Sequence, residues 1–210
     1  MAIEIRYKEA EGECFGMSKL WGCADLPHGC RYPEVEWVDE DGMTCADPMT
    51  FICQIRLQDI AAYDSENLLP YTGMLYFFAD IDYFLGNLEA DSPGMGQWDK
   101  DRYRVLYAPE TEYLDTHKIV CEDGTAFGLP AQELSFVHCE ERADSFKLLG
   151  KPYFEETEEE YPHYLSLLQL DCNDDWRLQF YDCGMLNILI TPEDLAARKW
   201  EQAICHLHSF

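Results

Sequence analysis

Two stretches of the sequence begin with glycine and continue as nearly unbroken apolar runs, and they limit the possible fold more than any other feature. They are residues 73–79 (GMLYFFA) and residues 184–190 (GMLNILI). A glycine suits the turn before each run, and a run without polar alternation is typical of a strand buried on both faces. Such a strand must lie inside a sheet, so we expect the other strands to pair around these two.

Three features recur in the same order along the chain, which indicates an internal duplication. The pairs are Lys19-Leu20 before Gly22 and Lys147-Leu148 before Gly150, the apolar strands that contain Gln54 and Gln169, and the runs that follow Gly73 and Gly184. The alternative is that ordinary apolar strands resemble each other by chance. We predict an α+β fold of mostly antiparallel sheets in a single domain, 1–210. Its two structurally related halves lie at approximately 14–110 and 142–210, with a connecting segment at 111–141.

The last segment of the chain has the pattern of a helix. Thr191 can cap its N-terminus, Pro192 suits its first position, and acidic residues follow. Ala196, Trp200, Ala203, Ile204 and Leu207 share one face at helical spacing. We therefore expect a C-terminal helix packed on the sheet.

The charge of the chain restricts its partners. It holds 15 basic and 41 acidic side chains, a formal net charge of −26. A surface of this sign repels phosphate, so we expect no nucleic-acid binding and no binding to anionic membranes. It is compatible with a basic protein partner, and the alternative is that the charge serves only solubility. The acidic run at 155–160 is interpreted in the same two ways, with a solvated surface favoured.

The sequence predicts a cytoplasmic protein, if the chain is full length. No apolar stretch approaches the roughly 20 residues of a membrane helix, and the first residues lack the apolar core of a signal peptide. The ten cysteines are therefore expected to be reduced thiols. No close cysteine pair marks a metal site, so we predict no metal, and a zinc site assembled from distant residues is the alternative.

Several short motifs resemble the YwqG-like family of bacterial proteins, and their order is more specific than any one of them. They are Ser18-Lys19-Leu20-x-Gly22, residues 51–57 (FICQIRL), Leu69-Pro70-x-x-Gly73-Met74-Leu75, Lys147-Leu148-x-Gly150-x-Pro152, residues 167–171 (LLQLD) and Asp182-x-Gly184. The resemblance implies an intracellular protein of two similar halves, with no activity, cofactor or catalytic residue to transfer. Association of some members with toxin–immunity gene neighbourhoods is a hint at function. The chain departs from the family pattern at residues 21–25.

No catalytic arrangement is recognisable, so no catalytic residue or cofactor is predicted and the question of an enzyme stays open. The sequence has no nucleophile elbow, P-loop or complete dinucleotide fingerprint. A glutamine inside an apolar strand needs hydrogen-bond partners. One hypothesis places Lys19, Gln54, Lys147, Gln169 and Asp182 in a ligand-binding groove between the halves. The alternative, which we favour, has each glutamine capping loop backbone inside its own half.

The leading functional hypothesis is a non-catalytic protein-interaction module of the immunity type with an acidic surface. It depends on the charge, the missing catalytic arrangement and the family resemblance. The second hypothesis is an enzyme or a small-ligand-binding protein that uses the groove between the halves.

Overall fold

The computed structural model describes residues 1–12, 14–121 and 124–210. Strands dominate the described chain. In order they are β1 (Ala2–Glu9), β2 (Lys19–Leu20), β3 (Ala24–Pro27), β4 (Glu34–Val38), β5 (Thr44–Pro48), β6 (Thr50–Arg56), β7 (Met74–Ala79), β8 (Gly96–Gln97), β9 (Tyr103–Ala108), β10 (Leu114–His117), β11 (Gln132–Cys139), β12 (Lys147–Leu148), β13 (Leu165–Asp171), β14 (Met185–Ile190) and β15 (Ile204–His208).

The helices are short. They are α1 (Leu57–Ile60), α2 (Glu155–Glu160) and α3 (Pro192–Ala196), with the 3-10 turns η1 (Tyr83–Leu85), η2 (Asp174–Trp176) and η3 (Trp200–Gln202). The predicted α+β class is therefore wrong. The described chain is mostly antiparallel β-structure.

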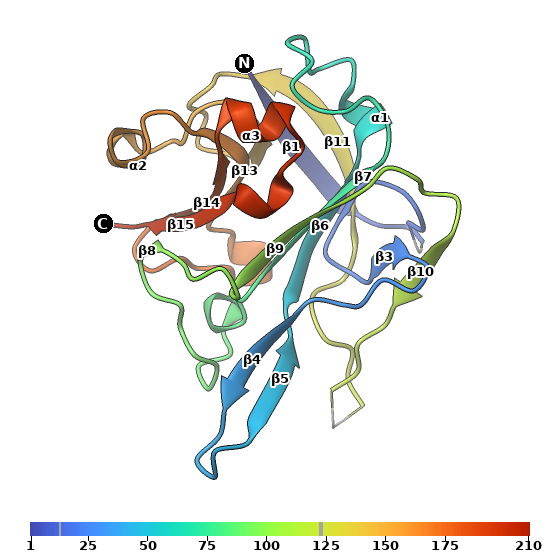
Figure 1. The fold of residues 1–210 in the computed structure, drawn as a ribbon, viewed down its shortest axis with the longest axis vertical. Coiled ribbons are helices and arrows are strands. Elements are labelled where there is room, and N and C mark those ends of the chain that lie inside the picture. Colours follow the sequence, from blue (N-terminus) through green and yellow to red (C-terminus); the bar gives the residue numbers. More distant parts are fainter. Residues whose placement is uncertain (13, 122–123) are drawn as a thin grey trace.

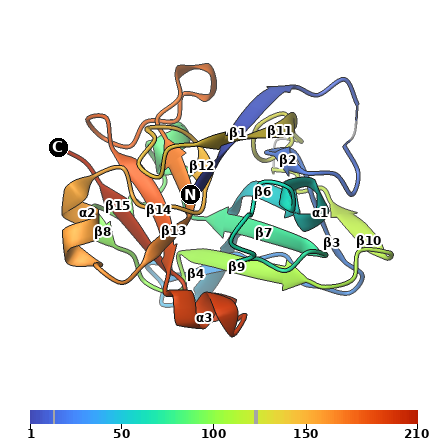
Figure 2. The same cartoon turned by 90° about the horizontal axis from the view of Figure 1, so that it is seen from above.

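One large antiparallel sheet organises the molecule. It has 11 strands in the order β8-β15-β14-β13-β12-β1-β11-β2-β6-β7-β9. The sheet curls into an open half-barrel, with β1 and β11 in its middle (Figures 1 and 2). Two smaller ribbons, β3–β10 and β4–β5, stand apart from it. The two glycine-led runs form β7 and β14, and both strands lie inside the sheet and are buried along their whole length.

The strands on either side of the central pair have matching registers. Lys19 on β2 faces Gln54 on β6, and Lys147 on β12 faces Gln169 on β13. The β6–β7 and β13–β14 pairs each contain one register shift near the start of β6 or β13. At the centre of β1–β11, Arg6 faces Ser135. The units β2-β6-β7-β9 and β12-β13-β14-β15 therefore occupy corresponding positions about the central pair.

The first strands of the two units are exchanged. β1 pairs with β12 and β11 pairs with β2, although β1 precedes β2 and β11 precedes β12 along the chain. The segment 111–141, expected to be a connection, thus contributes a strand to the middle of the sheet. Each unit is completed by a strand from the other part of the sequence.

The main hydrophobic core covers the concave face and draws on both units. Directly paired residues of neighbouring antiparallel strands point to the same face. Such a row crosses the sheet through Ile3, Leu148, Leu168, Ile188 and Cys205. All five side chains are buried in this core. A second core, which includes Leu26, Met49 and Tyr76, lies on the outer face of β6 and β7 under the β3–β10 ribbon.

The long C-terminal helix predicted from the sequence is wrong. Thr191 does cap α3, because its Oγ1 accepts from the Asp194 N–H at 3.1 Å, and Pro192 is the first residue. The helix ends at Ala196, and Arg198 has a left-handed φ of +57°. Residues 204–208 form β15, which pairs with β14. The acidic run at 155–160 forms α2, with Thr157 buried and Glu155, Glu156, Glu159 and Glu160 exposed.

Candidate functional site

The structure does not bring the five predicted groove residues together. Lys19 and Gln54 lie in the first unit and Lys147 and Gln169 in the second, with β11 and β1 between them. Asp182 lies on an exposed turn, where its backbone N–H donates to Ser209 Oγ at 3.1 Å. These residues therefore belong to three separate places rather than to one groove.

The polar cluster of the first unit is closed around Asp25, which is fully buried. Asp25 Oδ2 accepts from Lys19 Nζ at 2.7 Å and from Gln54 Nε2 at 3.0 Å, and Oδ1 accepts from Thr116 Oγ1 at 2.7 Å. Gln54 also donates to Met17 O at 2.9 Å. Because Lys19, Asp25 and Gln54 bind one another and are buried, this cluster holds loops onto the sheet.

In the cluster of the second unit the glutamine also binds loop backbone, but among the described residues no ion pair corresponds to that of Lys19 and Asp25. Gln169 Nε2 donates to Ala143 O and Ser145 O, each at 3.0 Å. Lys147 is fully buried and its Nζ donates to Ala143 O at 2.8 Å. Burial lowers the pKa of Lys147 to about 8. Both glutamines thus bind backbone groups inside their own units.

A different place in the fold has the features of a binding site. It forms where three neighbouring strands of the large sheet begin or end: Thr50 opens β6, Ala79 closes β7 beside it, and Tyr103 opens β9 beside Ala79. Asp80 and Arg102, the next residues along, are therefore adjacent. The Asp80 N–H donates to Arg102 O at 2.8 Å, and their side chains form an ion pair.

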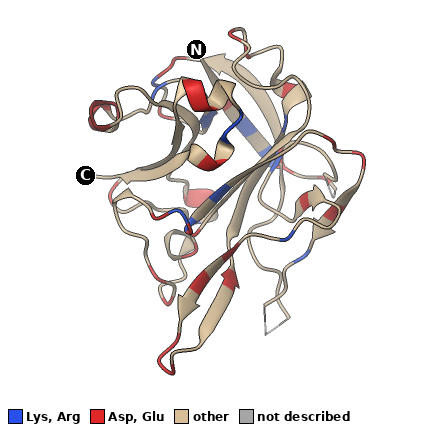
Figure 3. Cartoon of the chain, viewed as in Figure 1, with Lys and Arg blue, Asp and Glu red and all other residues tan. Residues whose placement is uncertain are grey.

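Thr50, Asp80 and Arg102 line a cleft with a volume of about 780 Å³. One wall is the β4–β5 ribbon, another is the loop that follows β7, and a third comes from residues 119–121 and 126–128. The ribbon projects from the sheet in Figure 1, and Figure 3 shows acidic positions on both of its strands. The charged side chains of the lining are Asp47, Asp80, Asp82, Glu89, Asp91 and Arg102. Carboxylates therefore outnumber the one guanidinium, and the cleft favours a cationic occupant.

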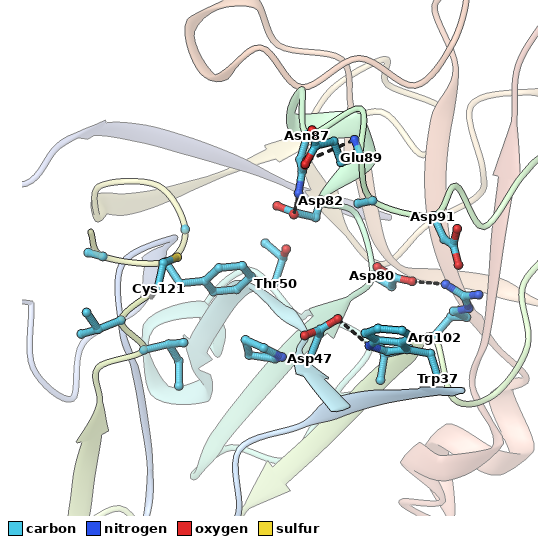
Figure 4. Close-up of a pocket in the computed structure, with 18 residues that line it drawn as sticks. Trp37, Asp47, Thr50, Asp80, Asp82, Asn87, Glu89, Asp91, Arg102 and Cys121 are labelled. Atoms are coloured by element: carbon cyan, nitrogen blue, oxygen red, sulfur yellow. Dashed lines mark hydrogen bonds and ion pairs between the residues drawn. The ribbon is translucent and has the colours of Figure 1, made fainter. Parts of the chain in front are cut away.

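The ribbon wall presents an aromatic ring to the cleft. Trp37 on β4 is 44% exposed, and its indole N–H donates to Asp47 Oδ2 on β5 at 2.7 Å (Figure 4). In the antiparallel register Val35 faces Asp47, so Val35, Trp37 and Asp47 share the face of the ribbon that lines the cleft. A carboxylate beside the ring of an exposed tryptophan is a surface suited to cations.

The inner part of the cleft is partly shielded from water. Burial raises the pKa of Asp80, and the Arg102 guanidinium opposes this shift without cancelling it. The loop beyond Asp80 is held by Asn87, whose Nδ2 donates to Asp82 Oδ2 at 2.6 Å. A charge on a ligand placed here would interact with these carboxylates more strongly than at an open surface.

Thr50 provides a polar group at the floor of the cleft. Its side chain lines the cleft but is only 2% exposed. Within the described part of the chain its Oγ1 has no hydrogen-bond partner. A buried hydroxyl without a partner costs about 1–3 kcal/mol, so a ligand that reaches it gains that interaction.

Sequence reasoning missed this cleft. The sequence shows acidic loops at 28–48 and after residue 79, but their meeting depends on strand pairing between distant segments. The sequence did contain one relevant pattern, Asp80-Ile81-Asp82 directly after a buried strand. Polar residues at the ends of neighbouring strands lie at the same edge of the sheet, where they can line a site.

The buried thiols of the described chain contribute to packing. Burial raises the pKa values of Cys53 and Cys205, so these thiols pack as small apolar groups. Among the described residues no group of three or more His, Cys, Asp or Glu side chains is placed to hold a metal ion. No helix in the described part of the chain is long and apolar enough to cross a membrane.

The fold and the cleft thus define a mostly antiparallel β protein with an acidic cleft at one end of its main sheet. The chain belongs to the family described as DUF1963, a domain of unknown function, whose sequence profile matches residues 18–144 and 132–208. The match does not carry the YwqG-like name, so that resemblance stays a prediction. A comparison with curated proteins finds no significant match.

Proposed function

We propose that this protein is a non-catalytic interaction module whose acidic cleft takes up a basic segment of a partner protein. The observation that supports it most is the surplus of carboxylates around one exposed tryptophan in a cleft of about 780 Å³. A cleft of this size admits more than one side chain, which suits a segment of polypeptide.

An immunity-type role is the specific form of this proposal that the family resemblance favours. In that form the partner is a toxin with a basic surface, and binding takes place in the cytoplasm. The acidic net charge of −26 would speed the encounter with a basic partner. The second hypothesis, an enzyme or a small-ligand-binding protein that uses a groove between the halves, has less support because the five residues it names lie in separate places.

The proposal is tested by measuring the affinity of a fluorescein-labelled basic peptide by anisotropy at low salt. The triple variant Asp82→Asn, Glu89→Gln, Asp91→Asn removes three charges from the cleft. We expect it to weaken binding about 10- to 100-fold, from about 0.5–1 kcal/mol for each charge.

The matched control removes three exposed charges from α2, which does not line the cleft: Glu155→Gln, Glu156→Gln and Glu159→Gln. This variant should bind as the wild type does. Equal weakening by both triple variants would show that only the overall charge matters, and the cleft would then not be the site.

A further inference from the structure

The unpartnered hydroxyl of Thr50 narrows the kind of cation that the cleft suits. It lies at the start of β6, on the side of Asp80 away from Arg102 and Trp37 in Figure 4. The hydroxyl can accept hydrogen bonds from a ligand as well as donate one, and the carboxylates that line the cleft favour a cationic donor over an anionic acceptor. An occupant that uses the whole cleft must therefore carry a donor group as well as positive charge.

Trp37 restricts the shape of the ligand group that fits the cleft. Its indole N–H is fixed on Asp47 Oδ2 at 2.7 Å, so the ring is held on the ribbon while 44% of the residue stays exposed. A flat cation can stack on such a ring, and a carboxylate beside the ring adds a charged partner at the edge. The ring and carboxylate together favour a planar group.

Asp80 indicates which type of cation the cleft accommodates. It already forms an ion pair with a guanidinium of the protein itself, that of Arg102. Asp82 and Asp91 line the cleft beside this pair. The electrostatic environment of the cleft thus accommodates a guanidinium, and carboxylates remain for a second one.

We infer that the occupant is an arginine side chain of the partner segment, whose guanidinium stacks on Trp37 and donates to Thr50 Oγ1 between the carboxylates of the cleft. This inference depends on the proposed function. A guanidinium has five N–H donors in one plane, so it can stack and donate at the same time, whereas a lysine ammonium is a compact point charge. The residues beside the arginine would rest on the apolar rim, where Val120 is 61% exposed.

The test compares hexa-arginine and hexa-lysine peptides of equal charge by anisotropy with the whole protein. We expect the arginine peptide to bind at least tenfold more tightly. Thr50→Val should weaken the arginine peptide at least fivefold and leave the lysine peptide unchanged. This variant should fold, because the hydroxyl it removes has no partner in the described structure. The control Thr44→Val alters an exposed threonine of the β4–β5 ribbon that does not line the cleft.

A second measurement follows the indole N–H signal of Trp37 by NMR during titration with N-acetyl-arginine amide or N-acetyl-lysine amide. A larger shift with the arginine compound is expected, and the same shift with both compounds counts against the inference. If neither peptide depends on the carboxylates of the cleft, the proposed function fails. If both depend on them with equal affinity and Thr50→Val has no effect, the arginine inference is overturned and the proposed function stands.

Discussion

At the scale of single residues, the two buried lysines occupy corresponding positions in the two units but differ in their charged surroundings. Asp25 and Tyr153 correspond, because the backbone N–H of each donates to the Oε1 of its unit's glutamine at 2.9 Å. The first unit therefore has a carboxylate for Lys19, and the second has a tyrosine at the corresponding chain position. Among the described residues no carboxylate oxygen lies within 4.0 Å of Lys147 Nζ.

Replacing each lysine by methionine should have opposite effects at pH 7. Lys19→Met leaves Asp25 buried without its ion pair and should cost about 3–5 kcal/mol. Lys147→Met removes a desolvated amine and should be neutral or stabilise by about 1–2 kcal/mol. Denaturant unfolding of both variants measures this. Similar losses in both would mean that Lys147 has a compensating partner.

The effect of Lys147→Met on the free energy of unfolding should depend on pH, because the pKa of this lysine differs between the folded and unfolded chain. The pKa of Lys147 is about 8 in the folded protein, against an ordinary value of 10.5 for a lysine in an unfolded chain. Between these pH values the unfolded chain holds a proton that the folded chain has lost, so this lysine makes folding more favourable as pH rises. The stability gained by Lys147→Met should therefore be largest below pH 8 and should fall by about 2–3 kcal/mol towards pH 10.5. Near pH 10.5 the methionine variant should then be less stable than the wild type. A constant advantage across this range would contradict the assignment.

The substitution Tyr153→Asp should supply the missing carboxylate. Tyr153 is 40% exposed, so the change does not open the core. An aspartate there should raise the pKa of Lys147 well above 8. The Lys147 Cε signal, titrated by NMR, reports the shift. Tyr153→Asn is the uncharged control and should leave the titration near its wild-type position.

At the scale of elements, the turns after β2 and β12 require glycine. Gly22 and Gly150 have φ values of +75° and +86°. A Cβ would lie 2.7 Å from Ala131 Cβ at the first turn and 2.8 Å from Ala2 Cβ at the second. Ala131 immediately precedes β11 and Ala2 begins β1, so the missing side chains let these exchanged strands lie close.

Alanine at either glycine should therefore destabilise by more than backbone strain alone. We expect Gly22→Ala and Gly150→Ala each to cost about 3 kcal/mol or more, and Gly29→Ala about 1 kcal/mol. Gly29 also has a positive φ, +77°, but a Cβ added there would meet no atom within 4 Å. Unfolding free energies decide this, and equal costs at all three positions would exclude the steric contribution.

The C-terminal segment shows the limit of reading an element from spacing. Trp200, Ala203 and Leu207 are buried, whereas Ala196, where α3 ends, is exposed. Their spacing fits a helix, but residues 203–207 are buried in succession. Continuous burial fits a strand covered on both faces, and pairing with β14 satisfies its backbone.

At the scale of the whole molecule, exchange of β1 and β11 ties the two units into one structure. The main core crosses from one unit to the other, and each unit lacks a strand without the other. Neither unit has a complete sheet of its own, so we expect the described chain to unfold as one cooperative body.

Ile3→Ala in β1 tests this cooperativity. Ile3 faces Leu148 and is buried in the shared core, so its truncation should cost about 2–5 kcal/mol. Hydrogen exchange should lose protection equally in β6–β7 and β13–β14. Val38→Ala on the exposed ribbon is the control and should change neither. Selective loss in β13–β14 would mean that the units open separately.

The sequence by itself determined the two buried strands β7 and β14, the cap and first residue of α3, and the acidity. Each depends on neighbouring residues or on composition: an unbroken apolar run, a Thr191-Pro192 start, and a surplus of carboxylates. Tertiary structure decided the mostly β class, the exchanged strands, the strand at residues 204–208 and the cleft. Thr50, Asp80 and Arg102 meet because β6, β7 and β9 pair side by side. Such pairing is set by the burial of whole faces across the sheet, which no local pattern in the chain records.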